Sequence, residues 1–258
     1  MWTALILAGQ RPGIDALAAA FGETKKALIR VDGVPMLARV ARTLLDSPDI
    51  ARVVILAQDA VSLAEAPGCE WLAREPRIGF AASGGGIATS VLAIGGTPAA
   101  PWPVLVTTAD HPLLTTAMIA AFIAGSADTD VAVGVVERRV VLAAYPANRR
   151  TWLRFRGGAW SGANLFALQG GRARPALEMW AGVERDRKSG WRLIGQLGPL
   201  LLAGAVLRLL TLDGAVARLG TRLGLRARAV ALRFAEAAID VDKPSDHQLA
   251  ELILRARA

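Results

Sequence analysis

The sequence has few of the residues on which disulfide-linked, zinc-binding and base-stacking proteins depend. One cysteine, Cys69, and two histidines occur in 258 residues, so the chain can form neither an internal disulfide nor a Cys/His zinc cluster. Aromatic residues make up only 5% of the chain, and no helix-turn-helix or zinc-finger spacing is recognisable. A nucleic-acid-binding function would therefore rest on positive charge alone, and we expect none.

The chain also lacks an apolar run suited to crossing a membrane. No charged residue occurs between Arg77 and Asp110, but prolines and glycines interrupt that stretch. Residues 193–207 are apolar but too short to span a bilayer, although they could lie on one. The first residues lack the basic region and cleavage site of a signal peptide. We expect a cytoplasmic protein, with attachment to a membrane surface as a secondary alternative.

What the chain does contain is an apolar and basic composition. Hydrophobic residues account for 53% of it, and 30 Lys and Arg against 22 Asp and Glu give a formal charge of +8. This composition is typical of a globular protein with a sizeable core. The charge favours anionic partners such as nucleotides, although arginine-rich codon usage explains it equally well. The length fits a single domain over residues 1–258 better than two independent cores.

Apolar runs alternate with segments of helical spacing. Helical spacing occurs at residues 36–45 and 118–123, and a last helix is expected from Pro244 to about Arg255. The apolar runs mostly lack polar alternation, which favours strands covered on both faces. They lie at residues 5–8, 53–57, 104–108, 131–136 and 164–168. The pattern predicts a three-layer α/β/α, Rossmann-like fold with a mixed, mostly parallel sheet.

The sequence pattern changes after Gly170. About sixty residues have helical spacing and many arginines, and no convincing strand occurs before Val230. We interpret residues 170–230 as a helical insertion.

The first chemical signal is a strand that breaks into a glycine loop. LILAGQR at residues 5–11 is followed by KKALIRVDGVPML at residues 25–37. Amides exposed after a strand bind anions, and a nearby cation offsets charge on a leaving pyrophosphate. The two segments resemble the N-terminal signature of the MobA-like nucleotidyltransferases, which have a GT-A-like fold. The resemblance assigns triphosphate binding to Leu7, Ala8, Gly9, Gln10, Arg11 and Lys26.

Within that set the resemblance gives Lys26 and Arg11 catalytic roles, with Lys25 as an alternative lysine. Two features depart from the family pattern. Gln10 stands where the second glycine is usual, and the loop that follows it is longer than normal. Without the resemblance, Gly9 and Arg11 would fit an ordinary turn at a strand exit.

The second signal is one carboxylate at the end of an apolar run. PVLVTTADHPLL at residues 103–114 places Asp110 where ligands bind in open α/β sheets. In the family, the aspartate at this position coordinates Mg²⁺, and the resemblance implies that Asp110 is catalytic and binds the metal. The alternative is an Asx turn before Pro112.

A second carboxylate for the same metal is expected near the last helix. IDVDKPSD at residues 239–246 resembles the closing motif of the family, which places Asp242 as the other Mg²⁺ ligand. Ser245 stands where an acidic residue is usual, and Asp240 is a weaker metal candidate that could instead support the metal ligands or contact the acceptor. The alternative is that Asp242 only caps the helix.

Three further segments resemble the regions that bind the nucleobase and the acceptor. SGGGIATSV at residues 83–91 makes Gly85 and Ser90 candidates for base recognition, although it could be a simple loop before a helix. SGAN at residues 161–164 resembles the family element in which the asparagine faces the acceptor, so Asn164 is an acceptor candidate. The alternative is a polar residue at the start of a strand. The basic residues proposed for the acceptor are Arg150, from a cluster with Arg149, Arg154 and Arg156, and Lys188. The alternative for that cluster is a solvated basic face.

Together the resemblances imply an enzyme that transfers a nucleoside monophosphate from CTP or GTP to a small phosphorylated acceptor, with Mg²⁺ as cofactor. Such chemistry needs positioning and charge stabilisation rather than a covalent nucleophile. One alternative is a catalytically inactive, nucleotide-binding regulatory protein of the same fold. An NAD-dependent Rossmann enzyme is disfavoured because Gly-x-Gly-x-x-Gly is absent after the first strand.

Overall fold

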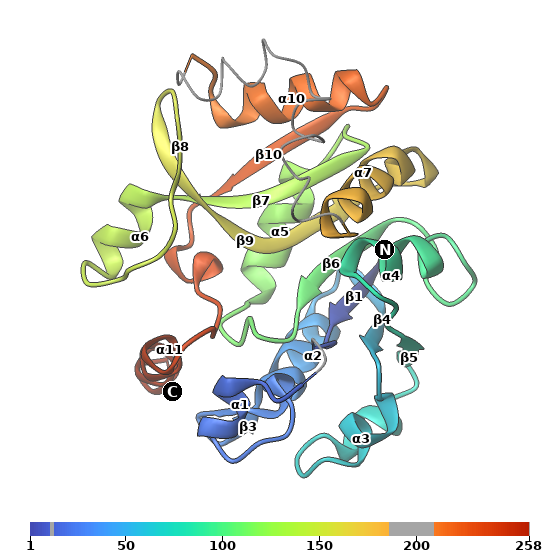
Figure 1. The fold of residues 1–258 in the computed structure, drawn as a ribbon, viewed down its shortest axis with the longest axis vertical. Coiled ribbons are helices and arrows are strands. Elements are labelled where there is room, and N and C mark those ends of the chain that lie inside the picture. Colours follow the sequence, from blue (N-terminus) through green and yellow to red (C-terminus); the bar gives the residue numbers. More distant parts are fainter. Residues whose placement is uncertain (11–12, 186–208, 258) are drawn as a thin grey trace.

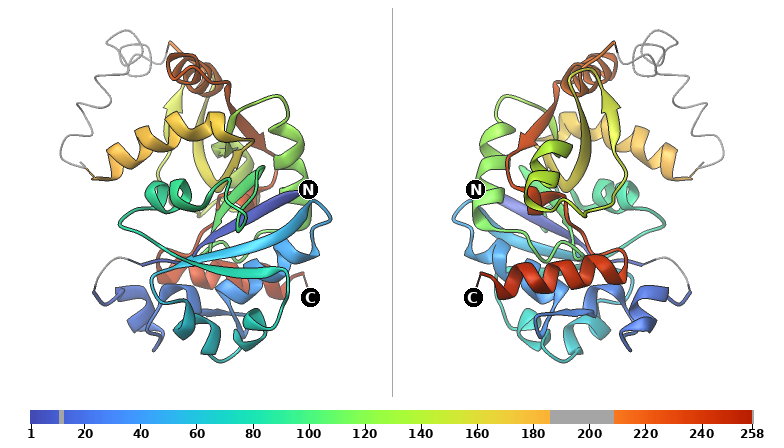
Figure 2. Two further views of the ribbon diagram at one scale, coloured as in Figure 1. Left: turned by 90° about the vertical axis from the view of Figure 1, so that its right-hand side faces the viewer. Right: turned by 90° about the vertical axis from the view of Figure 1, so that its left-hand side faces the viewer.

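The computed structural model describes residues 1–10, 13–185 and 209–257, which contain one eight-stranded sheet with helices on both faces (Figures 1 and 2). The strand order is β10-β7-β9-β6-β1-β4-β5, and β8 pairs with β9. The strand β9 runs antiparallel to β6, β7 and β8, and the other neighbours are parallel. The predicted mixed, mostly parallel sheet is therefore confirmed. Its strands are β1 (Trp2–Leu7), β4 (Ile50–Ala57), β5 (Ile78–Ala82), β6 (Val104–Thr108), β7 (Val131–Glu137), β8 (Leu153–Phe155), β9 (Gly158–Leu168) and β10 (Ala227–Leu232).

The central strands are apolar throughout because each face of the sheet has its own core. Ile6 of β1 lies in the cluster that also contains side chains of α2 (Met36–Asp46) and α5 (Thr116–Gly125). Its neighbour Leu5 lies in a second cluster, with α4 (Ile87–Ile94) and α7 (Arg174–Arg185). Successive side chains of a strand point to opposite faces, so a strand covered on both sides needs an unbroken apolar run.

A third cluster joins segments from the two halves of the chain. Leu17 of α1 (Ala16–Ala20) and Ile29, just after η1 (Lys26–Leu28), pack with Ile239 and Val241 and with the apolar side of α11 (Pro244–Arg255). The short hairpin β2 (Arg30–Val31) and β3 (Val34–Pro35) lies against α11, whose His247 ring hydrogen-bonds the carbonyl oxygen of Arg30 at 2.7 Å. This packing brings the segment around Lys26 close to the segment around Asp242.

Other short elements connect these layers. They are α3 (Ala60–Glu65), η2 (Glu70–Ala73), α6 (Arg138–Ala144), η3 (Gly171–Ala173), α10 (Leu212–Arg222) and η4 (Ala235–Ala238). The helices α7 and α10 fall inside the predicted insertion, but residues 186–208 lie outside the described residues, so the insertion as a whole stays a prediction. No helix in the described ranges is long and apolar enough to cross a bilayer.

The strand predicted at residues 164–168 is longer than expected, because β9 begins at Gly158. Asn164 has a φ of +49° within β9, and the pairing of β9 with β7 is irregular between Val133 and Val135. Asparagine tolerates this left-handed backbone better than most residues. Asn164 therefore marks a bulge inside the strand, not its start, which corrects the alternative of a polar residue at a strand start.

Candidate active site

The candidate site lies where two neighbouring parallel strands end. Leu7 of β1 pairs with Thr108 of β6, so the segments that follow both strands leave the sheet side by side. The amide of Ala109 donates to the carbonyl oxygen of Leu7 at 3.0 Å. The chain passes from β1 to β4 on one side and later returns to β6 on the other, so this is a topological switch point. Ligands in open α/β sheets bind at such points, outside the carboxyl ends of the strands.

Three predicted site residues meet at this edge. The Lys26 amine donates one hydrogen bond to Oδ2 of Asp110 and another to Oδ1 of Asp242. Lys26 and Asp242 are 216 positions apart in the sequence. The side chains of Lys26 and Asp110 are 21% and 20% exposed, whereas that of Asp242 is 65% exposed. The site is therefore a half-buried cation held between an inner and an outer carboxylate.

The two carboxylates fix the charge of this lysine. Burial lowers the pKa of Lys26, but the attraction of Asp110 and the hydrogen bonds to Asp110 and Asp242 outweigh burial, so its pKa is raised above the usual lysine value. A raised pKa keeps the amine protonated at neutral pH. The site consequently contains a permanent cation and two potential metal ligands.

The backbone around Asp242 explains how this residue reaches the site. The amide of Val241 donates to the carbonyl oxygen of Asp110 at 3.0 Å, which joins the two acidic segments directly. The N-cap of α11 is Lys243, without a side-chain capping bond, and Pro244 occupies its first turn. Asp242 is thus not the capping residue of α11, and the capping alternative is wrong.

Asp110 has a buried oxygen that no other described group satisfies. Oδ1 of Asp110 is buried and has no hydrogen-bond partner among the described residues, and no Asx turn forms. An anionic oxygen left free in this way suits a hard cation. In the ranges that the structure describes, no three acidic, histidine or cysteine side chains converge on one point. Mg²⁺ often takes only one or two carboxylates and completes its shell with water and phosphate oxygens, so Asp110 and Asp242 fit it.

The loop after β1 is held by a residue that the sequence did not single out. The side-chain amide of Gln58 accepts from the amide of Gln10 at 3.1 Å and donates to the carbonyl oxygen of Gln10 at 3.1 Å. A Cβ atom at Gly9 would lie 3.0 Å from both Gln58 and the hydroxyl of Ser83, so residue 9 must be small. Gln10 does not have a positive φ, so this position does not require the glycine usual in the family.

Other predicted triphosphate residues are placed differently. Lys25, the alternative lysine, donates to the carboxylate of Asp59 at 2.8 Å, which leaves Lys26 as the lysine that contacts Asp110. Ala8 is buried and its amide donates to the carbonyl oxygen of Leu56 at 2.9 Å. Arg11 lies outside the described residues.

The two base-recognition candidates have different surroundings. Ser90 is buried, and its hydroxyl accepts from the amide of Gly84 at 2.8 Å and donates to the carbonyl oxygen of Gly86 at 2.7 Å. Gly85 lies between these two residues, and nothing is within 4 Å of where its Cβ would be. Ser90 therefore braces the glycine loop from inside, while Gly85 is its open surface.

The acceptor candidates Arg150 and Asn164 both bind Asp240. Arg150 Nη2 donates to Oδ1 of Asp240, and Asn164 Nδ2 donates to Oδ2 at 3.1 Å. Burial raises the pKa of Asp240, but Arg150 and then Asn164 outweigh burial and hold it below the usual range. Asp240, the weaker metal candidate, is thus grouped with Arg150 and Asn164 instead of with Lys26.

The remaining basic candidates are not part of this cluster. Arg149, Arg154 and Arg156 are exposed, which agrees with a solvated basic face, and Arg150 alone of the four forms a described ion pair. Lys188 lies outside the described residues.

The Asp240 cluster leads to a prediction on stability. Asp240→Asn should lower the free energy of unfolding by about 2 kcal/mol near neutral pH, because it removes a charged hydrogen bond and leaves Arg150 without its counter-ion. A depressed folded-state pKa means that the contribution exists above the unfolded value of about 4 and is lost as pH falls through the folded value. The gap between wild type and variant should therefore shrink below about pH 4. Urea unfolding across this range measures it, and an unchanged gap contradicts the prediction.

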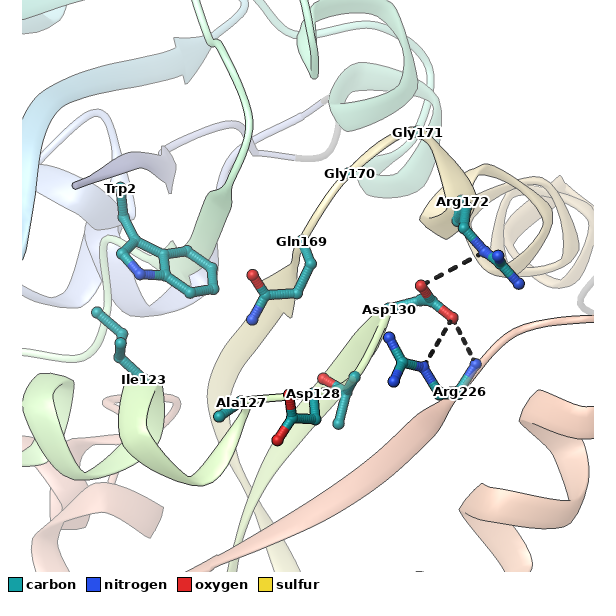
Figure 3. A pocket seen from close by; sticks show the side chains of 11 residues that line it. Trp2, Ile123, Ala127, Asp128, Asp130, Gln169, Gly170, Gly171, Arg172 and Arg226 are labelled. Carbon is teal, nitrogen blue, oxygen red and sulfur yellow. Dashed lines mark hydrogen bonds and ion pairs between the residues drawn. The ribbon is translucent and has the colours of Figure 1, made fainter.

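A hollow of about 540 Å³ lies at the opposite end of the sheet from the candidate site, where β1, β7 and β10 begin (Figure 3). The amide of Arg226 donates to Oδ2 of Asp130 at 2.7 Å, and Arg172 lies on the other carboxylate oxygen at 3.5 Å. These bonds tie the starts of β7 and β10 to η3. We assign this hollow a structural role, because its buried acidic group, Asp130, is already satisfied, while Asp128 is exposed.

Comparisons with known proteins agree with this architecture. A model of the MobA-like NTP transferase domain matches residues 4–199. A hypothetical transferase from Thermus thermophilus superimposes with a TM-score of 0.75 at 28% identity, over 95% of this chain and 98% of the other. No curated protein sequence matches the chain significantly.

Two further solved structures share the fold at lower identity. The 2-C-methyl-D-erythritol 4-phosphate cytidylyltransferase from Thermus thermophilus has a TM-score of 0.54 at 18% identity, over 98% of both chains. A CMP:2-keto-3-deoxy-manno-octonic acid synthetase, solved in complex with CTP, has a TM-score of 0.57 at 15% identity, over 100% of both chains. At such identities the likeness concerns the fold alone.

Proposed function

The chain belongs to the MobA-like NTP transferase family, and on this basis we propose that it is a Mg²⁺-dependent nucleotidyltransferase. Its donor is CTP or GTP, its acceptor a small phosphorylated molecule, and its by-product pyrophosphate. The observation that supports this most is the meeting of Lys26, Asp110 and Asp242 at the strand ends. A cation and two carboxylates at one point are what a metal-bound triphosphate needs for charge balance.

In the proposed reaction, a phosphate oxygen of the acceptor attacks the α-phosphorus of the triphosphate. The bond from that phosphorus to the oxygen bridging to the β-phosphate breaks, and pyrophosphate leaves. Lys26 offsets the negative charge that grows on the leaving group, and the loop of Gly9 and Gln10 orients the phosphates through backbone amides. When bound by Asp110 and Asp242, Mg²⁺ supplies further positive charge at the phosphates.

The acceptor is proposed to bind beside this point, along the segments that carry Asn164 and Arg150. The open glycine at residue 85 receives the base, because a flat ring can approach a backbone that has no side chain there. The two cytidine-nucleotide enzymes that share the fold support CTP as one of the two donors to test. We propose a cytoplasmic protein whose partners are nucleotides and not nucleic acid.

Binding and turnover separate this function from its alternative. Thermal unfolding with Mg²⁺ and each of the four triphosphates should show the largest rise in Tm with CTP or GTP, since at equal concentration a ligand that binds the native state more tightly stabilises it more. Pyrophosphate release is then measured with that triphosphate and a panel of sugar, polyol and other small phosphates. Tight binding without release on any acceptor supports the inactive regulatory protein, and no binding of any triphosphate overturns the proposal.

A further inference from the structure

A glutamate from α7 caps the helix that follows the glycine loop. The amide of Ile87 donates to Oε1 of Glu184 at 3.2 Å, and the amide of Ala88 donates to Oε2 at 3.0 Å. The N-cap residue of α4 is Gly86, which has no side chain to make these bonds itself. A carboxylate that lies 96 and 97 positions further along the chain thus satisfies two amides in the first turn of α4 that have no partner within the helix.

The position of Glu184 on its own helix is electrostatically unfavourable. Glu184 is in the last turn of α7, where the negative end of the helix dipole disfavours a carboxylate. The positive end of α4 favours the same carboxylate. The contact between the two helices therefore accounts for an acidic residue at this site, which the dipole of α7 by itself would disfavour.

The same carboxylate occupies the space beside Gly86. A Cβ atom at Gly86 would lie 2.6 Å from Oε2 of Glu184, far inside contact distance. Gly85 has open space instead. Gly86 therefore contacts the carboxylate of Glu184, whereas the neighbouring Gly85 faces outward.

The helix that delivers Glu184 is firmly packed. Leu177 of α7 is buried in one cluster with Val91 and Ile94 of α4, and Trp180 packs against it. The ring of Trp180 lies 5.0 Å from that of Phe166 on β9. The carboxylate is thus held against the loop by a rigid pair of helices on the sheet.

We propose that Glu184 is a positioning residue for the nucleobase. It fixes the loop of residues 84–86 in the conformation in which the backbone recognises the base, and it does not touch the reacting atoms. This inference rests on the proposed function. Its consequence is that α7 is coupled to the choice of triphosphate through one side chain.

The test compares Glu184→Ala and Glu184→Gln with Glu178→Gln, a control on the same helix whose carboxylate pairs with Arg174 at the surface. Isothermal titration with the four Mg²⁺-triphosphates should show about a fivefold rise in Kd for the preferred one in Glu184→Ala, as for the loss of a helix cap. In the same variant, the differences in Kd among the four triphosphates should become smaller. Its kcat and its KM for the acceptor should stay within about twofold of the wild-type values. The Kd of Glu184→Gln, which keeps one acceptor oxygen, should lie between those of the wild type and Glu184→Ala. The Kd of Glu178→Gln should match that of the wild type.

A second-site variant and a ligand-free measurement complete the test. Gly86→Ser combined with Glu184→Ala supplies a local cap in the space that the carboxylate leaves, and it should recover most of the affinity. Amide hydrogen exchange at residues 87 and 88 should quicken in Glu184→Ala and slow again in the double variant. Unchanged affinity and base preference in Glu184→Ala and Glu184→Gln would overturn the inference. A wild-type protein that binds no triphosphate would refute the proposed function itself.

Discussion

Replacing Asp110 with alanine should reduce pyrophosphate release at least about a hundredfold while the protein remains folded. Asp110 has one oxygen on Lys26 and a second, buried oxygen without a partner, so we expect its carboxylate to be the inner ligand for a divalent cation. Its carbonyl oxygen, which binds the amide of Val241, is unaffected by the substitution. The loss should therefore be in kcat, with the far-UV circular dichroism unchanged.

The matched control for Asp110 is an aspartate at the other edge of the sheet. Asp128 is exposed and has a φ of +58°, a conformation that asparagine adopts readily. Asp128→Asn should keep wild-type kcat, whereas Asp110→Asn should lose activity as Asp110→Ala does, because an amide neither carries the charge nor binds Mg²⁺ as well. Release at the wild-type rate by either Asp110 variant would refute the metal-binding role.

Replacing Lys26 with methionine should raise the Kd for the Mg²⁺-triphosphate at least about tenfold, while the KM for the acceptor stays within about twofold. The amine is the permanent cation of the site, and its hydrogen bonds to charged oxygens contribute more than neutral ones do. Lys25→Met decides between the two adjacent lysines. Lys25 binds Asp59 instead, so its loss should leave triphosphate affinity near that of the wild type. The reverse outcome would transfer the role to Lys25.

The Lys26→Met variant has a second readout that needs no turnover. Without the amine, Asp110 and Asp242 are left close together with no cation between them. The repulsion is modest because Asp242 is largely exposed, so we expect a fall in Tm of about 2–4 °C in chelator. Added Mg²⁺ should narrow the gap to the wild type, since the metal would replace the missing charge. A gap that Mg²⁺ does not change would contradict joint ligation by these two carboxylates.

The sequence predicted the sheet and the acidic pair for a definable reason. An apolar run that ends in Asp110 is a local signal, and parallel strands bring their ends to one side of the sheet. The pairing of Asp110 with Asp242 came from the resemblance of their two segments to motifs of the family. Their meeting at Lys26 is what the structure adds, and their role as metal ligands remains a prediction. By contrast, β5 was missed because IGFAA holds small residues and only two large apolar ones.

The residues that the sequence could not indicate act through distant partners. Gln58 binds the loop of Gln10, and Glu184 caps α4, yet neither belongs to a recognisable motif. Asp240 was a weaker metal candidate from its place in the motif that resembles the family's, and only the fold shows that Arg150 and Asn164 bind its oxygens. These contacts join residues 48 to 96 positions apart and are decided by packing, for which one sequence carries no local signal.

The third apolar cluster has a consequence for how the protein becomes active during synthesis. Asp242 is made 216 residues after Lys26, and it reaches the strand ends only when Val241 and α11 have packed against η1 and β2. The early part of the chain can begin to fold as it leaves the ribosome. A nascent chain that stops before this segment would then have the nucleotide loop but lack its outer carboxylate, so catalysis would begin only after Asp242 and α11 have been made and packed.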